Sequence, residues 1–207
     1  MDEDWHPIPD ARREILETAA RIDARPDHRL ALYIDLGGML VLAGNEAGLA
    51  AFETAMPRLQ DLYPMRLPNH AAFHTDLQEP VAAEGRARLG LDLFAQPALP
   101  LIDGLGGLWW PHATDPARLR DYTLGHQVVA PYDFAAAIRS AAREFMPDVF
   151  IVLGPGTTLG GAVAQSLTAA AWRGMTDKPA FQRAQSDTPR LIAMGREDQR
   201  PLATGIG

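Results

Sequence analysis

Apolar residues near the start of the chain recur at the spacing of an amphipathic helix. They lie at i, i+4 and i+7 and form a single stripe of Ile15, Ala19 and Ile22. Asp10 precedes this stripe, and we expect its side chain to cap the N-terminus of the helix. A second helix is expected after Asn45, another suitable cap. The pattern therefore predicts two helices in the first part of the chain.

Short apolar runs between and after these helices are typical of strands. Residues 30–34 and 39–43 lie on either side of a pair of glycines, which signals a turn, and residues 63–67 form a third run. Residues 1–68 are therefore expected to form a small α+β unit of the β–β–α–β kind.

The pattern then changes to that of an α/β protein. Thr75 and Gln78 have the spacing of a capping box at the start of a helical run. Asp115 and Asp133 are the caps expected for two further helices. Residues 99–102 are apolar and predict a short strand between the helical run after Thr75 and the helix capped by Asp115.

One apolar run differs from the others because it shows no alternation. Residues 149–153 are continuously apolar, as in a strand buried on both faces of a parallel sheet, and a glycine turn and a helix follow. Residues 173–207 are polar, contain three prolines, and are expected to form an irregular tail. The predicted divisions are thus residues 1–68, 69–172 and 173–207.

Composition narrows the class of protein. The 207 residues are 47% hydrophobic and 22% charged, which suits one folded domain, with or without a small appendage. The net charge of -7, with no basic patch, argues against a nucleic-acid partner. The absence of cysteine excludes disulfides and thiolate metal sites. No apolar run reaches the roughly 20 residues needed to cross a bilayer, so we expect a cytoplasmic protein without a membrane partner.

Two histidines are the first candidates for chemistry. His70 and His74 are four residues apart, which would suit a metal site if both lay on one face of a helix. The residues around them do not predict such a helix, so a metal site is not favoured. His74 as a general base is the sharper hypothesis, because imidazole titrates near neutral pH. An ordinary loop or core histidine remains the alternative.

A nucleophile is harder to find. The three serines are Ser140, Ser166 and Ser186, and none has the G-x-S-x-G setting that exposes a serine on a tight turn. The glycine-rich segment at 154–161 lacks the lysine of a phosphate-binding loop, so we interpret it as a strand-to-helix turn. The Trp109-Trp110 pair is expected to pack over a core edge, with a partner-binding patch as the alternative.

Three segments, taken in order, resemble the malonyl-CoA:acyl-carrier-protein transacylases. Residues 72–80 are similar to the F-H-S/T-x-L-M-x-P segment around the active-site histidine of that family. Residues 124–134 resemble its R-Q-L-x-x-P-V-x-W segment, and residues 153–159 resemble its E-x-G-P-G-x-x-L turn. The resemblance covers about residues 10–172. It implies an α/β acyltransferase fold, present here as an incomplete parallel sheet with helices and part of a ferredoxin-like small subdomain.

The resemblance also implies a reaction, the transfer of a malonyl group from coenzyme A to the phosphopantetheine thiol of acyl carrier protein in fatty-acid synthesis. His74 matches the catalytic histidine, and Gln127 matches the position whose main-chain carbonyl orients the imidazole. Phe73 matches a position where a bulky ring crowds a 2-methyl branch and so favours a malonyl substrate. No cofactor is implied, since the coenzyme A thioester is itself a substrate.

The departures from the family are as informative as the matches. The nucleophile elbow, the glutamine of the oxyanion hole, the arginine for the malonyl carboxylate and several strands of the large subdomain have no counterpart in this sequence. Phe134, His126 and Leu153 also replace the tryptophan, the arginine and the acidic residue of its motifs. We therefore expect a fragment, a truncated gene product or a relative that has lost catalysis, and an isolated chain without activity. The alternative is a non-catalytic module that binds acyl carrier protein or a complementary N-terminal chain.

Overall fold

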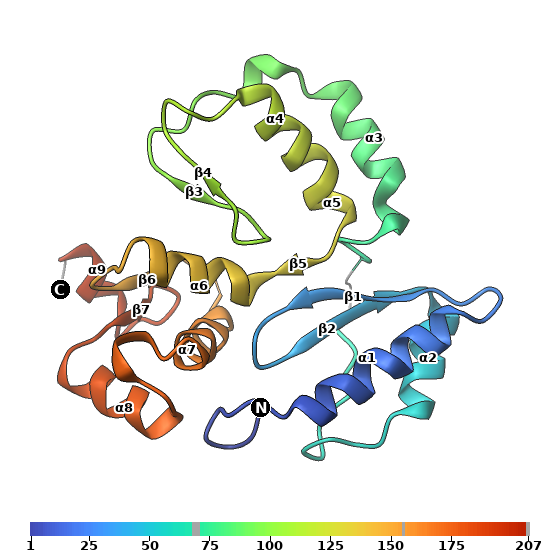
Figure 1. Ribbon diagram of the computed structural model, residues 1–207, viewed down its shortest axis with the longest axis horizontal. Helices are drawn as coiled ribbons and strands as arrows, with labels where there is room; N and C mark the ends of the chain where they lie inside the picture. Colours follow the sequence, from blue (N-terminus) through green and yellow to red (C-terminus); the bar gives the residue numbers. More distant parts are fainter. Residues whose placement is uncertain (68–70, 155, 206–207) are drawn as a thin grey trace.

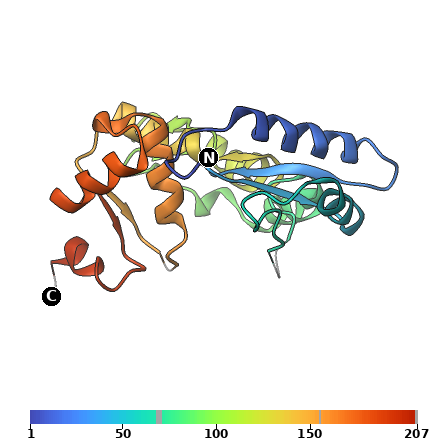
Figure 2. The ribbon, with the colours of Figure 1, turned by 90° about the horizontal axis from the view of Figure 1, so that it is seen from below.

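The computed structural model describes residues 1–67, 71–154 and 156–205, and their helices and strands fall into three groups in chain order (Figures 1 and 2). The first group comprises α1 (Pro9–Asp23), β1 (Leu30–Asp35), β2 (Leu40–Gly44) and α2 (Glu46–Ala55). The second comprises η1 (Asp76–Gln78), α3 (Glu79–Arg88), η2 (Leu91–Leu93), β3 (Leu101–Ile102), β4 (Leu108–Trp109), α4 (Pro116–Asp121), η3 (Tyr122–His126) and α5 (Gln127–Val129). The third comprises β5 (Tyr132–Asp133), α6 (Phe134–Glu144), β6 (Phe150–Val152), α7 (Leu159–Ala169), η4 (Trp172–Gly174), α8 (Lys178–Asp187), β7 (Leu191–Ala193) and α9 (Arg200–Thr204).

The first group confirms the predicted hairpin and its two helices. β1 and β2 pair antiparallel, and α1 and α2 meet them in one apolar cluster of Ala19, Ile22, Leu30, Phe52 and Met56. The third strand of this sheet is β5, which lies parallel to β1 and gives the order β2-β1-β5. The strand predicted at 63–67 is wrong. Tyr63 makes only an isolated bridge to Leu59, and Pro64 follows it without a main-chain N–H to donate to a ladder.

Helix capping matches the sequence at three of five predicted positions. The side chains of Asn45, Asp115 and Asp133 accept hydrogen bonds from main-chain N–H groups of the first turns that follow. Asp10 does not cap α1, because the helix already begins at Pro9 and places Asp10 inside its first turn. Thr75 forms no capping box either, since its hydroxyl donates to the carbonyl of Ala72.

A second sheet lies in the third group, where β6 pairs parallel with β7. A cluster built on α6, α7, η4, α8 and β7 forms the largest core, and Leu167 at its centre is 0% exposed. The expectation of an irregular tail after residue 173 is therefore wrong. Its polar composition reflects an amphipathic helix, α8, which buries Phe181, packs Ala184 against the core and exposes Gln182, Arg183, Ser186 and Asp187.

The expectation that residues 149–153 form a strand buried on both faces is also wrong. Phe150 and Val152 pack against the core, but Ile151 is 45% exposed and Leu153, just beyond the strand, is 76% exposed. This sheet has only two strands among the described residues. No helix within the described ranges is both long and apolar enough to span a membrane.

Candidate functional site

His74 lies in a turn whose backbone conformation is unusual for histidine. Its φ is 53°, in the left-handed region that few non-glycine residues adopt. The hydroxyl of Thr75, which is 4% exposed, donates to the carbonyl of Ala72 at 2.7 Å and closes the turn around His74. A strained position of this kind persists only where the surrounding contacts determine it.

Those contacts come from the end of a helix. α4, η3 and α5 are continuous from Pro116 to Val129, and the chain becomes extended at Ala130. The last carbonyls of a helix have no partner within it, and Pro131 has no N–H to offer them. His74 supplies the missing donors: its main-chain N–H bonds Val128 O at 2.9 Å, and its Nδ1 contacts Gln127 O.

This arrangement determines the protonation pattern of the imidazole. A carbonyl can only accept a hydrogen bond, so Nδ1 must carry the proton when the neutral ring bonds Gln127 O. Nε2 is then the unprotonated nitrogen and has no hydrogen-bond partner among the residues that the structure describes.

Two tyrosine rings contact the imidazole as well. The ring centroid of Tyr33, on β1, is 5.3 Å from that of His74, and the ring of Tyr132, at the start of β5, is 5.7 Å away. Burial raises the pKa of both phenols, and the carboxylates of Asp103 and Asp133 raise the pKa of Tyr132 further. Both rings therefore stay uncharged through the neutral pH range.

A cavity of about 350 Å³ adjoins His74. Its lining comes from the ends of β1 and β2 and from the segments around residues 74–77 and 129–131. Leu30, Ala31 and Ala43 supply an apolar wall, and Asp23, Arg29 and Asp76 supply charged groups. His74 is thus one of the residues that line a recess with both apolar and charged surface.

The remaining candidates that the structure describes take no part in the hydrogen bonds and ring contacts of His74. Phe73 is 46% exposed. His70 is outside the described residues, so the His70–His74 metal hypothesis is not addressed by the structure. Among the described residues, no group of three or more histidine, aspartate or glutamate side chains could hold a metal ion. Trp109 donates from Nε1 to Asp103, and Trp110 contacts Phe145 while remaining 46% exposed.

The hydroxyl groups of the three serines all form hydrogen bonds within the fold. Each hydroxyl donates to a main-chain carbonyl: Ser140 to Gly106, Ser166 to Ala162, and Ser186 to Gln182. Ser166 is also buried, at 3% exposed. These are the settings of structural hydroxyls: Ser166 and Ser186 bond back to their own helices, Ser140 bonds to a loop, and each hydroxyl proton is held by a carbonyl and not by a base.

Sequence reasoning missed Tyr33 and Tyr132. Each is an aromatic residue in a strand-like segment, which ordinarily indicates core packing. The only available signal was the sequence proximity of Tyr132 to Gln127, since the contact with His74 depends on the parallel pairing of β1 with β5.

Comparison with solved structures identifies the fold. The acyl-carrier-protein S-malonyltransferase of Burkholderia pseudomallei matches 94% of this chain with a TM-score of 0.67 and 18% identity. FabD of Acinetobacter baumannii matches 93% with a TM-score of 0.63 and 17% identity. The acyltransferase domain from the second module of the salinomycin polyketide synthase matches 92% with a TM-score of 0.58 and 22% identity.

The match covers only part of each known structure. This chain covers 55% of the Burkholderia structure, 54% of the Acinetobacter structure and 39% of the polyketide synthase structure. It thus has an α/β architecture that corresponds to about half of the acyltransferase fold. No protein-family model matches the sequence, and no curated protein matches it. The match covers 94% of the chain, which is more than the span of about residues 10–172 expected from motifs.

Proposed function

We propose that this chain is the histidine-bearing part of an acyltransferase that moves a malonyl group from coenzyme A to acyl carrier protein in fatty-acid synthesis. The observation that carries the proposal is the contact between His74 Nδ1 and the carbonyl of Gln127, within a chain that shares half of the acyltransferase fold. The contact leaves one basic nitrogen, Nε2, as the atom able to take a proton.

The chemistry proposed for His74 has two steps. In the first, Nε2 takes the proton of a serine hydroxyl as that oxygen attacks the thioester carbonyl, and coenzyme A leaves as the thiolate and regains a proton. In the second, Nε2 takes the proton of the phosphopantetheine thiol as its sulfur attacks the acyl-serine, and the serine oxygen is released and reprotonated. Gln127 would act through its main-chain carbonyl in both steps, holding the ring and its tautomer.

The serine of this mechanism must come from polypeptide that matches the other part of the fold. Every serine of the chain donates its hydroxyl to a main-chain carbonyl, so none of them suits the role. Phe73 is proposed to line the acyl-binding side of the site, where a large ring would disfavour a branched acyl group by about 1–3 kcal/mol per methyl. No cofactor is part of the proposal.

A reconstitution experiment tests the proposal. The part of the Burkholderia malonyltransferase that this chain does not match is supplied as a separate polypeptide or as a fusion, and transfer of labelled malonyl from coenzyme A to acyl carrier protein is measured. We expect transfer by the combination and none by either part alone. A stoichiometric acyl adduct on Ser140, Ser166 or Ser186 of the isolated chain would contradict the proposed role of a serine from elsewhere.

The occupied serines also support a second candidate, a non-catalytic module that binds acyl carrier protein or a complementary N-terminal chain. The two functions differ in what His74 does. A module would bind acyl carrier protein with the same affinity after His74→Gln, and reconstitution would yield a complex without transfer. Calorimetric titration of the chain with acyl carrier protein, alongside the transfer assay, distinguishes these outcomes.

A further inference from the structure

The imidazole of His74 makes ring contacts in addition to its hydrogen bond. The two rings come from two neighbouring strands of the same sheet. Tyr33 belongs to β1 and Tyr132 to β5, and residues 34 and 132 are partners in the parallel register of these strands. The β1 ladder shifts register between Leu32 and Ile34, so Tyr33 lies at an irregularity where strict alternation of faces is broken.

The geometry of the rings restricts how the imidazole can turn. The plane of Tyr132 is inclined by 26° to that of His74 in a stacked contact, and the plane of Tyr33 is inclined by 32°. Tyr33 is only 6% exposed, and Tyr132 is packed in turn against Phe134 at 6.2 Å. Rotation of the imidazole about its Cβ–Cγ bond would replace these near-parallel contacts with steric overlap or with gaps, both of which are unfavourable.

We propose that Tyr33 and Tyr132, called here the tyrosine pair, are positioning residues that set the plane of the His74 ring and thereby keep Nδ1 on the Gln127 carbonyl and Nε2 available. The inference rests on the proposed function only for the use made of Nε2. The positioning itself is a property of the folded chain and is testable without any catalytic reaction. The rings, rather than the hydroxyl groups, carry the effect.

Nuclear magnetic resonance of the full chain with isotope-labelled histidine tests the proposal. In the wild-type protein, we expect the His74 ring protons upfield of their positions in the urea-unfolded chain, because aromatic neighbours shield them. The nitrogen shifts should show a protonated Nδ1 and an unprotonated Nε2. Tyr33→Leu and Tyr132→Leu should each move the ring protons downfield and populate the other tautomer, whereas Tyr33→Phe and Tyr132→Phe should leave both signatures unchanged.

A matched control is built into the chain. The ring of Tyr122 stacks on His126 at 5.5 Å and 28°, so Tyr122→Leu should shift the His126 signals and leave those of His74 in place. The proposal would be overturned by wild-type His74 protons at their unfolded positions, by folded leucine variants that keep the wild-type tautomer, or by phenylalanine variants that lose it. The wild-type measurement and the phenylalanine variants keep the test valid if a leucine variant fails to fold. If the spectra behave as expected but the reconstituted wild-type protein transfers no malonyl group, the result counts against the proposed function and not against the tyrosine pair.

Discussion

Asn45 is the residue whose local role is clearest in both the sequence and the structure. Its Oδ1 accepts from the main-chain N–H groups of Gly48 and Arg29 at 2.9 and 3.0 Å, and its Nδ2 donates to Asp27 O at 2.8 Å. One side chain thus begins α2 and fastens the loop before β1. Gly48 has to be glycine here, because a Cβ at that position would lie 2.1 Å from the carbonyl oxygen of Arg29.

We predict that Asn45→Ala lowers the free energy of unfolding by about 1–2 kcal/mol, since it removes a helix cap and leaves neighbouring polar groups without their partner. Asp10→Ala is the matched control. It removes an exposed carboxylate that pairs with exposed Arg13, and it should cost less than about 0.5 kcal/mol. Urea denaturation of both variants checks the prediction, and equal effects would contradict the different roles of the two side chains.

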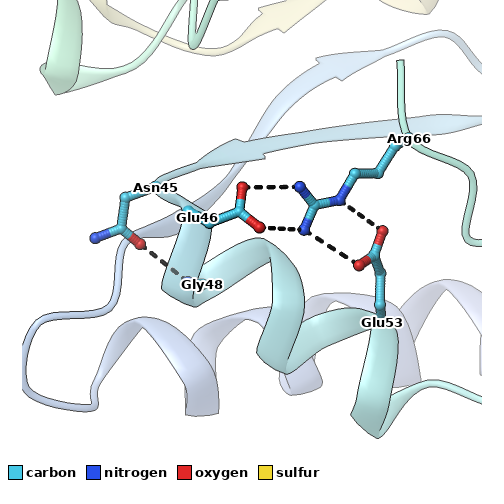
Figure 3. A network of polar contacts seen from close by, with 5 residues as sticks. All are labelled: Asn45, Glu46, Gly48, Glu53 and Arg66. Atoms are coloured by element: carbon cyan, nitrogen blue, oxygen red, sulfur yellow. Dashed lines mark hydrogen bonds and ion pairs between the residues drawn. The ribbon is translucent and has the colours of Figure 1, made fainter. Parts of the chain in front are cut away.

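At the scale of elements, the segment after α2 is held by a compact ion-pair network (Figure 3). Arg66 bonds both carboxylate oxygens of Glu46, at 2.8 and 2.9 Å, and both of Glu53, at 2.8 and 3.2 Å. The two glutamates lie on α2, so Arg66 fastens the chain to this helix shortly before the His74 turn. The hydrogen bond from Arg66 holds the pKa of Glu46 below its ordinary 4.5.

The sign of this pKa shift predicts a pH dependence. A carboxyl with a lowered folded-state pKa stabilises the fold at pH values above its ordinary pKa, and the contribution disappears as pH falls through the lower, folded-state value. We therefore expect amide hydrogen exchange in residues 58–67 to be slower in wild type than in Glu46→Gln above pH 4.5, with the difference vanishing in more acidic solution. A difference that persisted at low pH would contradict the role assigned to the ion pair.

We expect a larger loss of stability from a substitution in the core of the C-terminal elements than from Asn45→Ala. Phe181 is 7% exposed, contacts Trp5 at 5.6 Å and belongs to the main core cluster. Phe181→Ala should lower the free energy of unfolding by about 3–5 kcal/mol, as for other buried phenylalanines. Phe73→Ala, at a residue that is 46% exposed, should cost much less. If Phe181→Ala cost no more than Phe73→Ala in calorimetry, α8 would not be part of the core.

These elements show what could be predicted from the sequence. The hairpin, α2 and its cap followed from local signals, because glycine turns and cap side chains act on residues close in sequence. The contact between the His74 ring and the Gln127 carbonyl was also expected from the resemblance of their two segments, whereas the role of His74 in a reaction stays a prediction. The strand predicted at 63–67 failed because a strand needs a partner, and its apolar pattern does not supply one. The tyrosine pair was not predictable, since it is assembled by pairing across about 100 residues.

At the scale of the whole molecule, no further strand pairs with β6 on the edge away from β7 among the residues that the structure describes. The N–H of Phe150 and the carbonyl of Val152 bond toward the β7 side, so the corresponding groups of Ile151 point to the opposite edge. Ile151 and Leu153 expose 45% and 76% of their surface beside that edge. An apolar strand with an open edge is prone to pair with other chains.

We expect this surface to govern self-association of the isolated chain. Leu153→Lys should reduce the weight-average mass measured by sedimentation at high protein concentration, with little change in unfolding midpoint, because the side chain is already exposed and a charged edge resists pairing. Leu93→Lys, at another leucine that is 63% exposed but lies far from β6 in the sequence, is the control and should have a smaller effect. Equal masses for wild type and Leu153→Lys would contradict a role for the β6 edge.

The central claim is that His74 is the proton acceptor of an acyl transfer, and the most direct test compares two histidine variants in the reconstituted transferase. His74→Gln should lower the rate of malonyl transfer to acyl carrier protein by about 10²–10⁴-fold, the usual range for loss of a general base. His112→Gln, at an exposed histidine outside the site, should leave the rate within a few-fold of wild type. A folded His74→Gln variant that transfers malonyl at the wild-type rate would contradict the account.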